Sequence, residues 1–210
     1  MSEPVASGLT VILDYGMGNL RSVEKAVQSL GGEVAIQDSI QGATRLILPG
    51  VGAFGAAMER LAPLSDAIRG WANEGRPLLG ICLGQQLLFD RSEEMGQHQG
   101  LGLLPGEVRY FPADLSEDGQ TLKVPQMGWN GLAPQQPDGL LTGIQPGDMV
   151  YFVHSLYTAC EEPSFVAATT EYGMTYPSAI QAKNVWAAQF HPEKSGAIGK
   201  RILNNFLLTT

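Results

Sequence analysis

PLLGIC, at residues 77–82, is a short apolar run that continues directly into LGQQLLF, at residues 83–89. A short apolar run of this kind is typical of a strand buried on both faces of a parallel sheet. The first apolar run of the chain, LTVILD at residues 9–14, has the same character and ends in a glycine-containing turn at residues 15–18. The sequence therefore predicts buried strands that lead into helices.

Strands and helices alternate through the first half of the chain. After Asn19, a candidate helix N-cap, apolar residues fall at helical spacing until Gly31 and Gly32 end the pattern. We expect further strands at residues 33–37 and 45–48, and helices at residues 53–61 and 64–74. This alternation predicts an α/β fold with a doubly wound, mostly parallel sheet flanked by helices.

Shorter strand-like segments, separated by turn residues, make up the second half and predict a mixed or antiparallel part of the sheet. The expected strands are residues 107–111, 122–124, 149–157, 165–171, 178–182 and 185–190. A last amphipathic helix is expected after Ser195, a second candidate N-cap. We therefore predict a single domain over residues 9–210, preceded by a disordered lead-in at residues 1–8.

Composition and charge narrow the function classes. The chain has 210 residues and a net charge of −8, from 13 Lys and Arg against 21 Asp and Glu, so it lacks the basic stripe that binds nucleic acid. No window approaches ~20 apolar residues, and the start lacks the regions of a secretory signal. The spacing of Cys82 and Cys160 matches no zinc or redox pair. We expect a cytoplasmic protein with no metal and no membrane or nucleic-acid partner.

Gly80-Ile81-Cys82-Leu83-Gly84 has the G-x-C-x-G form of a nucleophile elbow, in which a strained turn between strand and helix exposes the central side chain. A helix N-terminus and a nearby imidazolium would favour the thiolate of Cys82. The N–H of Leu83 would then face a developing oxyanion. The alternative is a buried cysteine that packs as a small hydrophobic side chain, which is what we expect of Cys160.

A cysteine nucleophile needs a base and a group that orients the base. His191 follows the apolar run at residues 185–190, and Glu193 stands two positions later, where an extended stretch would project both side chains to the same side. We expect His98, in a polar stretch, to be a solvated loop residue, while His154 has either a packing or a functional role. Cys82, His191 and Glu193 thus form a candidate triad.

Residues 50–55, GVGAFG, match the G-x-G-x-x-G pattern of dinucleotide-binding loops. They follow the third expected strand rather than the first, and no acidic residue ends a strand about 20 residues later to bind a ribose. We therefore predict no nicotinamide cofactor. Two alternatives stay open: a turn whose glycines permit positive φ, or a loop whose N–H groups face an anion formed during catalysis.

Four ordered motifs together resemble the class I glutamine amidotransferases over essentially residues 9–208. They are PGVG at residues 49–52, GICLGQQ at 80–86, VHS at 153–155 and QFHPEKS at 189–195. Within that class, DYGMGNL at residues 14–20 and PQMGWN at 125–130 resemble the glutaminase subunits of imidazole glycerol phosphate synthase. Gln85 and Leu156 depart from the family pattern, and both departures concern the lining of the glutamine pocket rather than the triad.

The resemblance implies a glutaminase that needs no cofactor. Cys82 would attack the side-chain amide of glutamine, and His191, oriented by Glu193, would protonate the leaving ammonia. The remaining roles that the resemblance implies are an oxyanion hole of N–H groups from Val51, Gly52 and Leu83, and substrate binding by Gln86 and Ser155.

A partner follows from the same resemblance. The ammonia would pass to a separate cyclase subunit, a (β/α)8 barrel that makes imidazole glycerol phosphate and AICAR and forms a heterodimer with this chain. Candidate docking and gate residues are Asn19, Trp129, Tyr151 and Lys194, for which the alternatives are a helix cap, two core aromatic residues and a surface lysine. The resemblance also implies weak glutaminase activity until the cyclase binds its nucleotide.

Two rival functions remain. The first is an amidotransferase subunit for anthranilate, aminodeoxychorismate or pyridoxal phosphate synthesis, against which the segment at residues 125–130 argues. The second is a regulatory domain without activity, which the intact Cys82, His191 and Glu193 disfavour.

Overall fold

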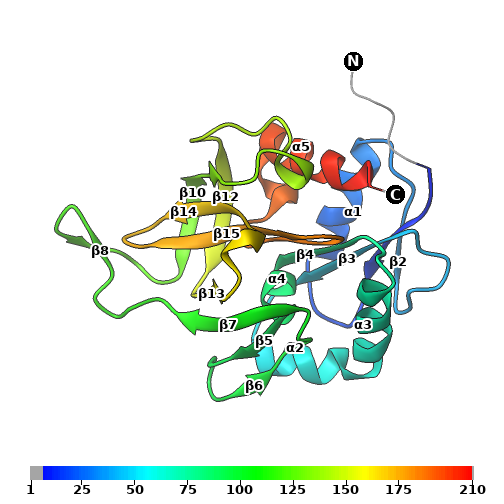
Figure 1. The fold of residues 1–210 in the computed structure, drawn as a ribbon, viewed down its shortest axis with the longest axis horizontal. Helices are drawn as coiled ribbons and strands as arrows, with labels where there is room; N and C mark the ends of the chain where they lie inside the picture. The colour runs from blue at the N-terminus through cyan, green and yellow to red at the C-terminus, as the bar shows by residue number, and fades with distance from the viewer. Residues whose placement is uncertain (1–6, 210) are drawn as a thin grey trace.

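The computed structural model describes residues 7–209, in which helices cover both faces of a central sheet (Figure 1). Within this range the sheet has eight strands in the order β11-β14-β15-β16-β4-β3-β1-β2. Its parallel part consists of β2 (Val34–Gln37), β1 (Thr10–Leu13), β3 (Arg45–Gly50), β4 (Leu78–Cys82) and β16 (Val185–Ala188), and its antiparallel part of β15 (Thr175–Ala182), β14 (Val166–Glu171) and β11 (Ala133–Pro134). The predicted α/β fold with a mostly parallel, partly mixed sheet is confirmed.

The helices divide between the two faces because successive side chains of a strand point to opposite sides. On β1, Ile12 packs into the core beneath one pair of helices, whereas Val11 and Leu13 pack into the core on the other face. The first core is covered by α1 (Leu20–Ser29) and α5 (Gly196–Leu207), and the second by α2 (Phe54–Leu61), α3 (Ser65–Asn73) and α4 (Leu83–Leu87) (Figure 1). The 3₁₀ helices are η1 (Ala62–Leu64), η2 (Gly139–Leu141), η3 (Pro163–Phe165) and η4 (Pro192–Lys194).

Smaller sheets account for the rest of the second half. In the described range β10 (Gln126–Gly131) pairs with β12 (Met149–His154), and β8 (Ser116–Glu117) forms a projecting hairpin with β9 (Gln120–Thr121) (Figure 1). A further sheet is built, in order, from β13 (Leu156–Cys160), β7 (Leu104–Tyr110), β5 (Phe89–Ser92) and β6 (His98–Gln99).

Two expected strands differ from the structure. Residues 122–124 are not a strand, because Asp118 and Gly119, at φ +49° and +76°, turn the preceding residues into the β8–β9 hairpin and leave residues 122–124 as its exit. The expected strand at residues 149–157 is two strands in different sheets, β12 and β13, which meet at Ser155. This break exposes Ser155 at the rim of a pocket.

Neither candidate N-cap caps its helix through its side chain. Asn19 and Ser195 occupy the N-cap positions of α1 and α5, but neither side chain accepts a capping hydrogen bond. The Ser195 hydroxyl instead donates to the carbonyl oxygen of His191 at 2.6 Å and accepts from the N–H of Tyr151 at 2.9 Å. Ser195 therefore ties the chain after β16 to β12.

The buried Arg45 joins the two ends of the described chain. Its guanidinium donates to the carbonyl oxygens of Ser7, Gly8 and Leu207, at 3.2 to 3.5 Å. Of the lead-in expected at residues 1–8, residues 1–6 lie outside the described part. Across residues 7–209, every helix is too short or too polar to cross a membrane.

A buried aromatic cluster surrounds His154 on β12. Its ring lies 5.3, 5.6 and 5.4 Å from the rings of Phe111, Phe152 and Tyr176, measured between centroids. The His154 Nδ1 donates to the carbonyl oxygen of Leu156 at 2.7 Å. Burial lowers the pKa of His154 to about 4, because desolvation outweighs the opposing effect of that hydrogen bond. The imidazole is therefore neutral in the folded protein at neutral pH.

Gly84 fixes how closely α4 approaches the sheet. A Cβ at this position would lie 1.8 Å from the carbonyl oxygen of Leu48 on β3, so Gly84→Ala must move backbone. We expect Gly84→Ala to lower the free energy of unfolding by about 3 kcal/mol, measured by urea denaturation. The matched control is Gly70→Ala in α3, where a Cβ meets nothing within 4 Å and the stability should rise by about 0.5–1 kcal/mol. Equal stabilities of the two variants would contradict this packing.

The neutral His154 makes stability depend on pH. Its folded pKa lies below the unfolded value of 6.5, so the unfolded chain takes up the proton first and stability falls as the pH drops from 6.5 towards 4. We expect the wild type to lose about 2 kcal/mol more than His154→Gln between pH 7 and pH 5, measured by urea denaturation. If His154→Gln kept the wild-type pH dependence, the His154 imidazole would not be the titrating group.

Candidate active site

The carboxyl ends of three neighbouring parallel strands build one corner of the molecule. Gly50 at the end of β3 pairs with Cys82 at the end of β4, and Ala188 at the end of β16 pairs with Ile81. Since parallel strands end at the same edge of a sheet, the segments that follow them meet there. This geometry brings together the loop after β3, the start of α4 and the chain that carries His191.

Cys82 stands in a strained turn between β4 and α4. Its backbone has φ +55° and ψ −112°, a conformation that residues other than glycine rarely adopt. Glycines flank it on both sides: a Cβ on Gly80 would lie 2.8 Å from the carbonyl oxygen of Gly84. The predicted strained elbow is confirmed, and the Cys82 sulfur faces a pocket.

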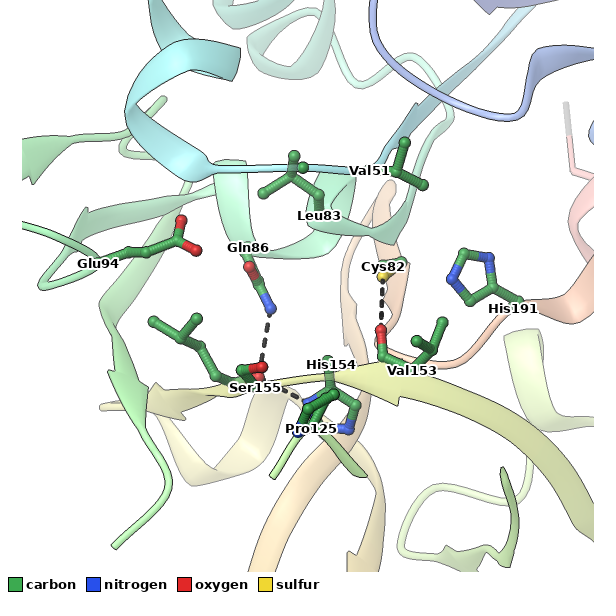
Figure 2. Close-up of a pocket in the computed structure, with 12 residues that line it drawn as sticks. Val51, Cys82, Leu83, Gln86, Glu94, Pro125, Val153, His154, Ser155 and His191 are labelled. Carbon is green, nitrogen blue, oxygen red and sulfur yellow. Dashed lines mark hydrogen bonds between the residues drawn. The ribbon is translucent and has the colours of Figure 1, made fainter. Parts of the chain in front are cut away.

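His191 and Glu193 form a buried pair beside Cys82. Nδ1 of His191 lies 2.7 Å from Oε1 of Glu193, and both side chains are almost fully buried. The contact is made through the 3₁₀ turn that begins at Pro192, and not through the extended stretch that we expected. Figure 2 shows the ring of His191 beside the thiol of Cys82. Among residues 7–209, no atom makes a hydrogen bond with Nε2 of His191 or with Oε2 of Glu193.

The electrostatics of this pair favour an imidazolium. Burial lowers the pKa of His191, but Cys82 and the carboxylate of Glu193 raise it more strongly, to about 9. Burial, together with Cys82, also raises the pKa of Tyr15, whose hydroxyl donates to the carbonyl oxygen of Pro49 at 2.8 Å. His191 is therefore the group that holds a proton beside the sulfur at neutral pH.

A pocket of about 330 Å³ opens in front of Cys82, large enough for a small metabolite (Figure 2). Its lining comes from the loop after β3, the elbow, the turn after β5, the residue before β10, the β12–β13 break and the segment after β16. The lining residues are Val51, Gly52, Cys82, Leu83, Gln86, Glu94, Pro125, Val153, His154, Ser155, Leu156 and His191.

The candidate substrate residues lie on this pocket. The Gln86 amide Nε2 donates to the carbonyl oxygen of Leu156 at 3.3 Å and to Oε1 of Gln189 at 3.1 Å, and Figure 2 shows this side chain directed towards Ser155. Val51, Gly52 and Leu83, the candidate oxyanion residues, line the pocket beside the sulfur. Glu193 lies behind His191 and does not line the pocket.

Two residues at the site were not singled out from the sequence. Glu94 lines the pocket, and its Oε2 also accepts a hydrogen bond from the N–H of Phe54 at the start of α2. The acidic stretch at residues 93–94 carries no signal that separates it from a solvated turn. Gln189 is fully buried, with Nε2 3.8 Å from the sulfur of Cys82, and its only sequence signal is its place in the motif at residues 189–195.

Three of the four candidate docking residues form one cluster. Trp129 on β10 is 54% exposed, and its ring meets that of Tyr151 on β12 edge-on, with 6.1 Å between centroids. The Lys194 Nζ lies 6.0 Å from the centre of the Tyr151 ring. Asn19 is exposed elsewhere, beside a small cavity that Val51, His191 and Glu193 also line.

One sequence expectation needs correction. His98 is not a solvated loop residue: it lies on β6, half-buried, with its ring 6.4 Å from that of Phe54. A Cβ on Gly55 would lie 2.6 Å from the His98 ring, so the third glycine of the G-x-G-x-x-G run serves packing. Gly52 has φ +105°, as expected if residues 50–55 form a turn whose glycines permit positive φ.

Cys160 differs from Cys82 in its surroundings. It is half-buried on β13, burial raises the pKa of its thiol, and its sulfur donates to the carbonyl oxygen of Glu162. Over residues 7–209, His, Cys, Asp and Glu side chains form no group of three or more that could hold a metal ion.

Comparison with known proteins places this geometry in a family. The pattern of the glutamine amidotransferase class-I family matches residues 11–210. Among curated proteins, imidazole glycerol phosphate synthase subunit HisH of Syntrophotalea carbinolica is 50% identical over 94% of this chain and 98% of its own. HisH of Aquifex aeolicus is 47% identical over 94% of this chain and 95% of its own.

Solved structures agree on the fold. A structure described as PurLQS from Thermotoga maritima superimposes with a TM-score of 0.74 at 18% identity, over 96% of this chain and 98% of that chain. A structure described as glutamine amidotransferase gives a TM-score of 0.72 at 21% identity, over 95% and 97% of the two chains. The chain belongs to the class I glutamine amidotransferases and, within that family, to the HisH subunits.

Proposed function

We propose that this chain is the glutaminase subunit of an imidazole glycerol phosphate synthase, which hydrolyses glutamine to glutamate and ammonia through a Cys82-His191-Glu193 triad. The observation that carries the proposal is the strained Cys82, which opens onto a pocket beside a buried His191–Glu193 pair. The identity of 45–50% to several HisH subunits supports the choice of pathway over the rival amidotransferases.

In the first step the Cys82 thiolate attacks the side-chain carbonyl carbon of glutamine. The resulting tetrahedral oxyanion accepts hydrogen bonds from N–H groups of Leu83 and of the Val51–Gly52 loop. Leu83 is the first residue of α4, where backbone N–H groups lack partners within the helix. The carbon–nitrogen bond then breaks, and His191 gives its proton to the leaving nitrogen to form ammonia.

In the second step water hydrolyses the γ-glutamyl thioester. The neutral His191 takes a proton from the water as it attacks the thioester carbon, and the thiolate leaves as glutamate forms. This returns the imidazolium and thiolate of the starting state. The raised pKa of His191 supports this cycle, because Glu193 stabilises the imidazolium through Nδ1 and leaves Nε2 for the reacting groups.

The pocket offers partners for the polar groups of glutamine. Glu94 contributes the carboxylate on the lining, which suits the α-ammonium group of the substrate. Gln86 and Ser155 lie next to each other on the lining (Figure 2) and bind the remaining polar groups of the substrate. The departures at Gln85 and Leu156 do not remove any of these three side chains.

Ammonia must reach its acceptor without passing through water, where at neutral pH it becomes ammonium and is no longer a nucleophile. A cyclase subunit with a (β/α)8 barrel receives it and produces imidazole glycerol phosphate and AICAR. The face of the β10–β12 sheet that carries Trp129 and Tyr151 supports a docking role, since Met127 and Met149 on the same face are 65% and 46% exposed. Lys194 lies beside the Tyr151 ring at this face, and Asn19 lines a small cavity together with His191 and Glu193.

Nucleotide binding to the cyclase raises the glutaminase rate in this proposal. The Val51–Gly52 peptide completes the oxyanion hole in the activated complex, and Gly50 and Gly52 make its reorientation inexpensive.

Cys82→Ala should abolish glutamine hydrolysis. Without the nucleophile no thioester forms, and we expect the rate of glutamate release to fall at least about 10⁴-fold in the complex with cyclase and its nucleotide. Glutamate release is measured with the chain alone and in that complex. Cys160→Ala is the matched control and should retain wild-type turnover. A Cys82→Ala variant that still turned over would exclude the proposed chemistry.

Glu94→Gln should weaken glutamine binding and spare the chemical step. The substitution removes the charge while an amide oxygen can still accept the hydrogen bond from Phe54. Loss of one charge-assisted contact predicts a rise in KM of about tenfold to a hundredfold with little change in kcat. Steady-state kinetics of glutamate release in the complex tests this. A fall in kcat at constant KM would instead assign Glu94 to the chemistry.

A further inference from the structure

The fully buried side chain of Gln189 lies between the nucleophile and the wall of the pocket. Its Nε2 is 3.8 Å from the Cys82 sulfur, and its Oε1 accepts from Nε2 of Gln86 at 3.1 Å. The backbone N–H of Gln189 donates to the carbonyl oxygen of Ser178 at 2.9 Å, which fixes the position of its Cα on the sheet. The mechanism described above gives this side chain no task.

Gln86 determines which end of the Gln189 amide faces the sulfur. Because the NH₂ group of Gln86 donates to Oε1 of Gln189, the NH₂ group of Gln189 is turned towards Cys82. Gln86 is itself held by the carbonyl oxygen of Leu156, at 3.3 Å. Flipping the Gln189 amide would set two NH₂ groups against each other and place an oxygen against the sulfur.

Loss of the thiol proton changes which neighbouring groups attract the Cys82 sulfur and which repel it. As a thiol, Cys82 donates to the carbonyl oxygen of Val153 at 3.9 Å (Figure 2). As a thiolate it can only accept, so the Val153 oxygen repels it while the Gln189 N–H attracts it. The Gln189 amide therefore favours the reactive form and draws the sulfur away from Val153.

Tyr15, His154 and Glu193, which lie near Cys82, form hydrogen bonds with groups other than the sulfur, and His191 transfers the proton of the reaction. Tyr15 donates to the Pro49 carbonyl oxygen, His154 donates through Nδ1 to the Leu156 carbonyl oxygen, and Glu193 pairs with His191. His191 gives its proton away during the cycle. A neutral amide donor keeps its hydrogen bond to sulfur throughout.

We propose that Gln189 is a positioning residue whose amide N–H donates to the Cys82 thiolate, holding it in the reactive orientation and linking it through Gln86 to the substrate pocket. This inference rests on the proposed function, since it concerns the same nucleophile. It adds a donor that is distinct from the oxyanion hole, because it acts on sulfur rather than on the substrate oxygen.

The test compares Gln189→Met and Gln189→Glu with Gln85→Met, all in the full-length chain with Cys160→Ala. Gln85 is a matched control: it is also fully buried, but its Nε2 donates to Thr158 rather than to the sulfur. The rate of Cys82 alkylation by iodoacetamide is measured against pH by mass spectrometry, which requires neither cyclase nor glutamine. Steady-state kinetics of glutamate release follows in the complex, and urea denaturation checks that each variant folds.

Loss of the donor should move the pH of half-maximal alkylation up by about one unit in Gln189→Met. The shift in Gln189→Glu should be at least as large, because a carboxylate repels the thiolate. We expect kcat to fall about tenfold in Gln189→Met, with KM within about threefold of wild type. Gln85→Met should alkylate with the wild-type pH dependence.

Two results would overturn the inference. One is a wild-type alkylation profile in either folded Gln189 variant. The other is an equal shift in the Gln85→Met control, which would reflect loss of a buried amide in general. The proposed function fails on a separate result: a Cys82 that alkylates normally in the wild type but releases no glutamate with cyclase and nucleotide present.

Discussion

The strained turn at Cys82 is the constraint on which the site depends. A residue with a side chain is held at φ +55° only because the strand before it and the helix after it are both packed without freedom to relax. Gly80 and Gly84 allow that packing, since a Cβ on either would meet backbone atoms at 2.8 Å or less. The strain is maintained by the sheet, and its consequence is a thiol that points out of the core into a pocket.

Around this turn the protein buries polar groups that satisfy one another. A continuous series of hydrogen bonds runs from Leu156 through Gln86 and Gln189 to the Cys82 sulfur. In a medium of low polarity each such bond fixes the orientation of the next, because an unpaired amide would be costly. Two atoms of the His191–Glu193 pair have no partner within the described chain. Nε2 belongs to His191, which lines the pocket, whereas Oε2 of Glu193 lies behind the imidazole.

The pKa values of two buried histidines shift in opposite directions because their surroundings differ. His154 is enclosed by aromatic rings and stays neutral, since desolvation lowers its pKa to about 4. His191 is buried as well, but a carboxylate and a sulfur raise its pKa to about 9. Burial acts on both rings, and the groups beside His191 account for the difference in charge. Only a charged imidazole can give a proton to a leaving nitrogen.

Local signals in the sequence determined the alternation of buried strands and helices, the glycine-flanked cysteine and the family resemblance, because each depends on residues close together in the chain. The prediction of a strand at residues 122–124 was wrong, because the turn at residues 118 and 119 forms a hairpin from the residues on either side of it. The contact between His191 and Glu193 could be predicted because the two residues are only two positions apart. The 3₁₀ turn through which they meet was not evident from the sequence pattern. The positions of Glu94 and Gln189 at the site could be recognised only in the structure, because no local sequence pattern shows which groups a single carboxylate or amide side chain contacts. Only the tertiary structure decided which groups they face, by bringing segments distant in the chain to one edge of the sheet.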